Sequence, residues 1–205
     1  MTRKQLRDET ITLLVAGHAT TALALAWTWY LLSTHPAVEA RLHNELKEVL
    51  GGRIPGATDI GRLPYLQAIM NESLRLYPPA PLLSRRSIAP CSIGDYEFPA
   101  NTTFIMSPWV LHRDERFFDD PESFHPERWL DGERLTPPSK AYFPFGIGPR
   151  RCIGEGFALL EAQLVLAVIA QQFQLRLVPG HIVEPEVFIT LRPRFGMRMR
   201  VCTRT

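Results

Sequence analysis

The apolar and polar positions along the chain predict a long helix at its start. Residues 11–32 contain no Asp, Glu, Lys or Arg, and a helix that is apolar all round is typical of one buried within a protein core. We therefore expect a helix over residues 4–33, covered by protein on all sides. Its length also matches a membrane span, but its threonines and the central His18 are unfavourable in a bilayer. We predict no membrane span.

Apolar residues at helical spacing predict three further helices. Pro36 opens the first, and Gly51-Gly52 ends it. The second runs over residues 64–77, where Pro78-Pro79 stops it. The third covers residues 153–172.

Between and after these helices the pattern changes to short alternating runs. Residues 80–106 predict small strands and hairpins, and the Pro- and charge-rich stretch 114–139 predicts a long ordered loop. Alternation returns in residues 173–205, which predicts C-terminal strands. The expected fold class is therefore mainly α with small β-sheets (α+β).

Composition narrows the class of protein. The 205 residues are 45% hydrophobic and 21% charged, as in an ordinary globular domain with a real core. The net charge of +2 gives no basic footprint for nucleic acid, so we expect no nucleic-acid partner. Three scattered cysteines do not suggest a disulfide framework, which favours a reducing, cytoplasmic setting.

The most informative segment is "FPFGIGPRRCIGEGF", residues 143–157. Cys152 comes just before a predicted helix and beside Arg150 and Arg151, and helix-end amides with nearby positive charge stabilise a thiolate. Gly146 and Gly148 let the backbone approach a flat or bulky group. On these residues alone, a buried inert cysteine, a dinucleotide loop and a catalytic nucleophile remain alternatives.

The same segment resembles the haem-binding signature of the cytochrome P450 family. Its pattern F-x-x-G-x-R-x-C-x-G is met by Phe145, Gly148, Arg150, Cys152 and Gly154. The resemblance implies haem b with Cys152 as its axial thiolate, a ligand that favours O–O cleavage. It also implies a set of residues around the cofactor, namely Phe145, Gly146, Arg150, Gly154, Arg85, Ala16 and Gly17. Arg85 and Arg150 are the expected partners of the haem propionates.

A second motif lies in the helix over residues 64–77. Glu72 and Arg75 are three residues apart and so share one helix face, where they can pair. By resemblance, Arg128 in "HPERW" is the third member of a buried ion network with them. We expect this network to be structural, locking the loop that carries Cys152. We interpret His112 and His125 as structural too, because they lack metal-ligand spacing.

The first helix contains "AGHATT", residues 16–21, which resembles the oxygen-side pattern of the family. Ala16 and Gly17 would leave room for O₂ and substrate. Thr20 is the predicted catalytic residue, its hydroxyl diverting a helix carbonyl or binding water and distorting the helix locally. Ala19 stands where the family usually has an acid, and we expect proton delivery to be impaired there.

The resemblance covers residues 6–201 and corresponds to the C-terminal half of the family's usual length. It implies oxidation of an apolar small molecule with O₂ and electrons from a separate ferredoxin- or flavodoxin-type protein that docks near Arg150 and Arg151. Two alternatives remain: a truncated remnant that retains no haem, and a peroxide-using haem-thiolate enzyme. Substrate-facing candidates are Ala16, Leu82, Leu83, Phe188 and Ile189. The chain is expected to form a single partial domain over residues 1–205, divided into 4–33, 36–77, 80–139, 140–172 and 173–205.

Overall fold

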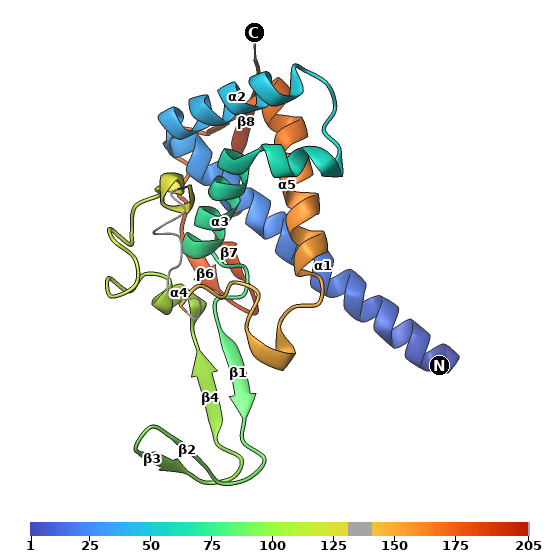
Figure 1. Ribbon diagram of the computed structural model, residues 1–205, viewed down its shortest axis with the longest axis vertical. Coiled ribbons are helices and arrows are strands. Elements are labelled where there is room, and N and C mark those ends of the chain that lie inside the picture. Colours follow the sequence, from blue (N-terminus) through green and yellow to red (C-terminus); the bar gives the residue numbers. More distant parts are fainter. Residues whose placement is uncertain (131–140, 205) are drawn as a thin grey trace.

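The computed structural model describes residues 1–130 and 141–204 (Figure 1). The helical elements are α1 (Arg3–Thr34), α2 (Pro36–Leu50), η1 (Ala57–Arg62), α3 (Pro64–Leu76), α4 (Pro108–Leu111), η2 (Pro126–Trp129), η3 (Gly148–Arg150) and α5 (Glu155–Gln172). The strands are β1 (Leu83–Arg86), β2 (Cys91–Ile93), β3 (Tyr96–Phe98), β4 (Thr103–Met106), β5 (Phe173–Leu177), β6 (Pro185–Val187), β7 (Leu191–Pro193) and β8 (Met199–Thr203).

Small antiparallel sheets accompany the helices. β1 pairs with β4, β2 with β3, β5 with β8, and β6 with β7, each as a two-stranded sheet. The β1–β4 ladder extends away from the helices and carries the β2–β3 hairpin at its far end (Figure 1). The prediction of a mainly α fold with small β-sheets is confirmed.

The core lies where α1, α2, α3 and α5 meet. Its fully buried side chains come from every one of these helices, among them Leu32, Leu42, Leu66 and Leu166. Local sequence sets the helix bounds. Pro36 and Pro64 occupy first-turn positions that need no amide hydrogen, and Gly51 ends α2 at a φ of 58°, a left-handed conformation that glycine adopts without strain.

Trp27 fixes α1 to the rest of the core. Its side chain is fully buried, and its ring stacks on Tyr77 with centroids 4.2 Å apart. The indole Nε1 donates to the carbonyl of Leu191, 3.0 Å away, while the Leu191 amide donates to the carbonyl of Pro79. The C-terminal half of α1, the end of α3 and β7 are therefore joined at one point.

The N-terminal half of α1 is exposed, although we expected a helix buried on all sides. Residues 3–19 are exposed, and this half projects from the body of the molecule (Figure 1). The expectation is wrong for this half, because the buried residues of α1 among those described all lie from Thr21 onwards. By length and apolar composition alone α1 could cross a membrane. A core helix of a soluble protein passes the same test.

The loop that follows β4 wraps around α3. It includes the short helices α4 and η2, of which only η2 lies within the loop predicted over residues 114–139. The predicted loop also extends into residues 131–140, which lie outside the described residues. Within the described part, Phe118 and Phe124 are buried against the core. The loop thereby brings residues 112–129 onto α3.

Candidate functional site

Cys152 lies in a tight turn that leads into α5. The Cys152 amide donates to the carbonyl of Phe145 over 2.9 Å, and the Gly146 amide donates to the carbonyl of Phe143 over 2.9 Å. Gly146 and Gly148 have φ angles of 74° and 71°, so the turn requires residues that adopt the left-handed region readily. The thiol is exposed and forms no disulfide, and α5 begins three residues later at Glu155.

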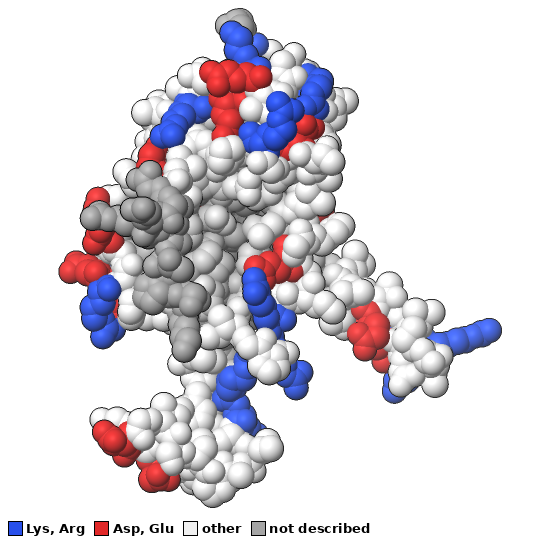
Figure 2. All heavy atoms as spheres, in the orientation of Figure 1, with Lys and Arg blue, Asp and Glu red and all other residues white. Residues whose placement is uncertain are grey.

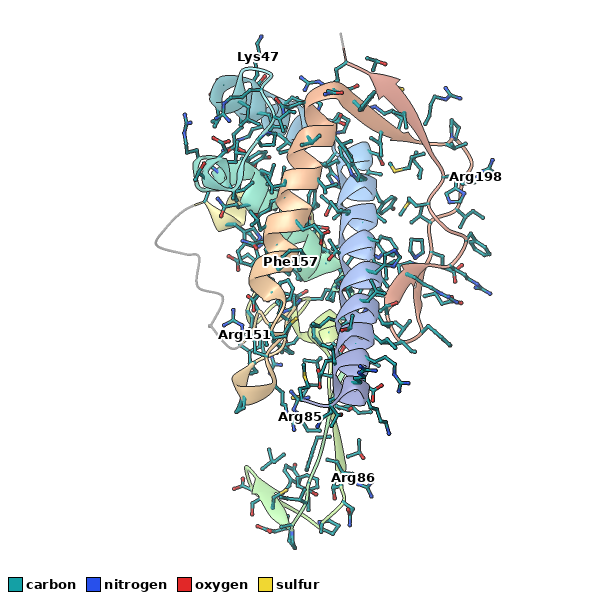
Figure 3. The ribbon with its side chains drawn as sticks, turned by 90° about the vertical axis from the view of Figure 1, so that its right-hand side faces the viewer. Lys47, Arg85, Arg86, Arg151, Phe157 and Arg198 are labelled. Carbon is teal, nitrogen blue, oxygen red and sulfur yellow. The ribbon has the colours of Figure 1, made fainter. Side chains whose placement is uncertain are left out.

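Arginines surround this turn. Arg151 forms an ion pair with Glu155, whereas Arg150 is exposed and forms no ion pair with any described residue. Arg151 and Arg85 lie towards the same end of the molecule, and Arg86 follows further along β1 (Figure 3). Figure 2 shows basic side chains gathered between the helical body and the β2–β3 hairpin. Of the two arginines predicted to attract an electron donor, Arg151 is paired with Glu155, and Arg150 has no ion-pair partner within residues 1–130 and 141–204.

The side chains of Glu72, Arg75 and Arg128 meet as a buried ion network. Glu72 and Arg75 are 0% exposed. The Glu72 carboxylate accepts from Nε and Nη2 of Arg75 at 2.9 Å each and from Nε of Arg128 at 2.9 Å. It also accepts from the His125 amide and from Nε1 of Trp129. Burial alone would raise the pKa of Glu72, but the hydrogen bonds from Arg75 and the His125 amide and the charges of Arg75 and Arg128 lower it.

Arg75 ties the network to the loop around α3. Its Nη1 donates to the carbonyls of His112 and Pro121, at 2.7 and 2.6 Å, and its Nη2 donates to the carbonyl of Ser123 at 3.0 Å. With the bonds to Glu72, all five guanidinium hydrogens have acceptors. Sequence reasoning placed the three charged residues but missed Trp129, although an aromatic residue directly after Arg128 was a usable signal.

His112 and Tyr142 join this region to the segment that leads to Cys152. His112 is fully buried, and its Nε2 accepts from the amide of Phe143 over 3.0 Å. The Tyr142 hydroxyl donates to the carbonyl of Asn71 on α3 over 3.1 Å. The interpretation of His112 as structural agrees with this placement, but its contact with the Phe143 amide could not be predicted from the sequence.

The folded protein is expected to lose stability as the pH falls because His112 is buried. Burial, together with the charges of Arg75 and Arg113, lowers the pKa of His112 from 6.5 to about 3. The unfolded chain therefore takes up a proton near pH 6.5 that the folded chain refuses, so stability is full above that pH and declines below it. Between about pH 7.5 and about pH 5.5, urea unfolding should show a lower free energy of unfolding.

His112→Gln should weaken this pH dependence without removing it. His43 contributes in the same direction, because burial lowers its pKa as well. Equal losses in the unsubstituted protein and in His112→Gln over the same pH interval would contradict the assignment.

The residues of "AGHATT" lie where α1 leaves the core. Ala16, Gly17 and Ala19 are exposed, Thr20 is half-buried and Thr21 is buried. The Thr20 hydroxyl donates to the carbonyl of Ala16 over 2.7 Å, and α1 is one continuous α-helix through this point. The hydroxyl thus engages a helix carbonyl, and a local distortion of the helix at Thr20 stays a prediction. The threonines at positions 10, 12 and 28 make the same bond to the carbonyl four residues earlier, so the bond does not set Thr20 apart.

The other predicted site residues are spread over several elements. Arg85 is exposed on β1 and donates to the carbonyl of Ser84, and no described residue forms an ion pair with it. Leu83 lies against the cysteine turn, since its Cδ1 is 3.6 Å from the place that a side chain on Gly146 would occupy. Leu82 is exposed, as are Phe188 and Ile189 between β6 and β7. Their roles towards propionates or substrate stay predictions.

The described residues fit a haem held by Cys152. The iron of a haem brings most of its ligands in the macrocycle and can take a cysteine thiolate from the protein. The exposed thiol supplies one ligand. Exposed apolar side chains of the same segment, Ile147, Ile153 and Phe157, supply surface for a macrocycle. Figure 3 shows Phe157 on α5.

Comparison with known proteins agrees with the site. The family model for "Cytochrome P450" matches residues 1–195. The chain is 43% identical over 191 residues to cyclooctatin synthase of Streptomyces melanosporofaciens, covering 93% of this chain and 42% of that protein. It is 42% identical over 206 residues to the chloroplastic protein LUTEIN DEFICIENT 5 of Arabidopsis thaliana, covering 98% and 35%. It is also 43% identical over 173 residues to cyclooctat-9-en-7-ol 5-monooxygenase of Streptomyces melanosporofaciens, covering 84% and 38%.

The fold, the cysteine turn and these matches together define a protein of the haem-thiolate class. The chain belongs to the cytochrome P450 family. It spans about two-fifths of the length of the curated relatives that it matches.

Proposed function

We propose that the protein is a haem-thiolate monooxygenase that oxidises an apolar small molecule with O₂. The observation that carries the proposal is the exposed Cys152 thiol, held in a turn that is closed by the bond from the Cys152 amide to the Phe145 carbonyl. The family match supports haem b as the cofactor. When bound through a thiolate, haem supplies activation of O₂ for insertion of one oxygen atom into substrate.

The residues of this chain would hold the cofactor and exclude water around it. Cys152 would provide the thiolate ligand, and the glycines of the turn would allow close approach of the backbone. Phe145, Gly146 and Gly154 would line the thiolate side, while Ala16 and Gly17 on α1 would leave space on the opposite side. Arg85 and Arg150 offer guanidinium groups with no ion pair to a described residue, which suits them to carboxylates such as propionates.

An apolar substrate is supported by both the chain and its relatives. Leu82, Phe188 and Ile189 present exposed apolar side chains that need a cover. The name of one relative, cyclooctat-9-en-7-ol 5-monooxygenase, states that it oxidises a cyclic alcohol. We infer that this protein also acts on a mostly apolar molecule, in contact with Ala16, Leu83 and the β6–β7 turn.

We also propose an electron donor and a cellular location for the protein. Electrons would come from a separate ferredoxin- or flavodoxin-type protein that docks beside the exposed Arg150, since an acidic partner is drawn to a free basic charge. We propose a cytoplasmic protein in which α1 is no membrane span, because its C-terminal half is packed in the protein core.

Ala19 favours a second candidate, a haem-thiolate enzyme that uses peroxide directly. An alanine side chain transfers no proton, and the Thr20 hydroxyl hydrogen is engaged with the Ala16 carbonyl. Product formation with O₂ and an electron-donor system, compared with peroxide alone, separates the two candidates. A protein that retains no haem at all would instead be a non-functional remnant.

Ala19→Glu is expected to raise the fraction of consumed electrons that appear in product. A carboxyl group at this position can hold and release a proton on the side of α1 where O₂ would react, and a positioned acid contributes about 10²–10⁴-fold to proton transfer. The measurement is the ratio of product to reduced donor consumed in the haem-loaded protein. Ala19→Gln is the matched control, because it has nearly the same shape and no proton to transfer. Unchanged coupling in Ala19→Glu, or an equal gain in Ala19→Gln, would remove the support for a missing proton relay.

A further inference from the structure

The ion network at Glu72 does not itself reach the cysteine turn. The hydrogen-bond partners of Glu72, Arg75 and Arg128 among the described residues all lie on α3 or in residues 112–129. The turn that presents Cys152 begins at Phe143. If the network is to lock that turn, another group has to connect them.

His112 makes that connection. Its Nδ1 is 3.2 Å from the carbonyl of Arg75, and its Nε2 is 3.0 Å from the amide of Phe143. Its own carbonyl accepts from Nη1 of Arg75 over 2.7 Å. Both ring nitrogens and the backbone of one buried residue therefore join Arg75 to the first residue of the turn.

These contacts fix the state of the ring. The Phe143 amide is a donor, so Nε2 has to accept, and the ring hydrogen has to sit on Nδ1 and point at the Arg75 carbonyl. That carbonyl belongs to the last turn of α3, where carbonyls lack helical partners. The neighbouring Arg113 donates to the Leu76 carbonyl in the same way. A neutral His112 thus caps α3 and holds the turn with one side chain.

The bonds continue through the turn to the cysteine. The carbonyl of Phe143 accepts from Gly146, and the carbonyl of Phe145 accepts from Cys152, each over 2.9 Å. A shift of the Phe143 amide would therefore move the backbone that sets the direction of the thiol. Loss of such supporting partners around a ligand reduces metal affinity by about 10–100-fold.

We propose that His112 is a positioning residue. It accepts a hydrogen bond from the Phe143 amide and thereby holds the Cys152 turn in place against the Glu72–Arg75–Arg128 network. This role rests on the proposed function only as far as Cys152 binds haem. The placement of the turn by His112 is a property of the polypeptide itself.

A competing explanation is that the imidazole only fills space. His112 packs against Tyr142 and Phe143, with ring centroids 5.2 and 5.4 Å away, and Tyr142 provides a separate tie to Asn71. The positioning role depends on the acceptor atom that faces the Phe143 amide, whereas space filling depends only on the volume of the side chain. Substitutions that change one property and keep the other therefore separate the two explanations.

Three substitutions at His112 separate the acceptor from the volume. In His112→Gln the amide oxygen can take the place of Nε2 and keep the bond to Phe143. His112→Asn reaches only as far as Nδ1, so it can keep the bond to Arg75 but leaves the Phe143 amide unpaired. His112→Leu keeps apolar volume and makes neither bond. His125→Leu is the control, since that imidazole is exposed and its network contact comes from the backbone.

Two readouts are needed, one with haem and one without. The reduced, CO-bound absorption spectrum gives the thiolate-ligated fraction, and hydrogen–deuterium exchange of residues 141–152 in the haem-free protein reports the turn directly. We expect His112→Gln and His125→Leu to match the unsubstituted protein. His112→Asn and His112→Leu should lose most of the thiolate-ligated fraction, since a lost supporting partner costs about 10–100-fold in metal affinity. Their turn should also exchange faster than that of the unsubstituted protein.

Equal behaviour of the Gln, Asn and Leu variants in both readouts would overturn the proposal in favour of simple space filling. If no form of the protein binds haem, the proposed function fails while the exchange measurement still decides the role of His112. If the variants do not fold, a nitrogen–nitrogen scalar coupling across the bond from the Phe143 amide to His112 Nε2 in the unsubstituted protein replaces them. Its presence supports the bond, and its absence overturns it.

Discussion

Glu72→Lys is expected to abolish haem incorporation and to lower the free energy of unfolding by about 3–5 kcal/mol, the range for breaking a buried ion pair by removing one partner. The carboxylate accepts from two arginines, an indole and a backbone amide while it is fully buried. A lysine there would place a third positive charge beside Arg75 and Arg128. Neither guanidinium can lose its proton to relieve the repulsion.

Disruption of the ion network should also disturb the haem site, because Arg75 holds the loop that contains His112. Haem content per polypeptide and urea unfolding measure the two effects. Glu48→Lys, the same charge change at an exposed position of α2, is the control and should leave both unchanged. A Glu72→Lys protein that retains full haem would refute the role assigned to the network.

Cys152→Ser is expected to remove O₂-dependent product formation and to weaken haem binding by more than the about 10–100-fold cost of losing a supporting partner. A serine hydroxyl is not ionised near neutral pH, so it cannot replace a thiolate as an electron-donating ligand. The turn itself should survive, because its bonds come from backbone amides and carbonyls.

Cys91→Ser and Cys202→Ser are matched controls at the two other free cysteines, neither of which lies in the turn. Haem retention on gel filtration and product formation from an apolar substrate distinguish the three variants. Full activity in Cys152→Ser, or equal losses in all three variants, would contradict the assignment of the ligand.

Much of the fold could be predicted because helix signals are local. Pro36, Pro64 and Gly51 mark helix ends that the structure has at the same places, since a ring without an amide hydrogen and a residue free of a side chain act within one turn. The short 3₁₀ helix η1 had no such signal. Asp59 caps it by accepting from the Gly56 amide, and that contact is not visible as an apolar pattern.

The exposure of α1 could not be predicted, because it depends on what packs against the helix. Residues 11–32 are apolar along their whole length, yet burial begins only at Thr21. The same limit applies to Thr20. Its hydroxyl was expected to divert a helix carbonyl or to bind water, and in the structure it donates to the Ala16 carbonyl.

The contacts of the candidate site could also be predicted only in part. A spacing of three residues places Glu72 and Arg75 together on one helix face. The resemblance to the family added Arg128, which is 56 residues from Glu72 along the chain. The bonds from His112 to Phe143 and from Tyr142 to Asn71 join residues far apart in sequence. No local rule relates them, so only the packed structure identifies them.

The absorption spectrum of the reduced, CO-bound protein tests the central claim most directly. The account predicts the band of a thiolate-ligated haem, present in the protein with Cys152 and absent from Cys152→Ser at equal haem content. A band typical of a neutral ligand in the unsubstituted protein, or an identical thiolate band in Cys152→Ser, would contradict it.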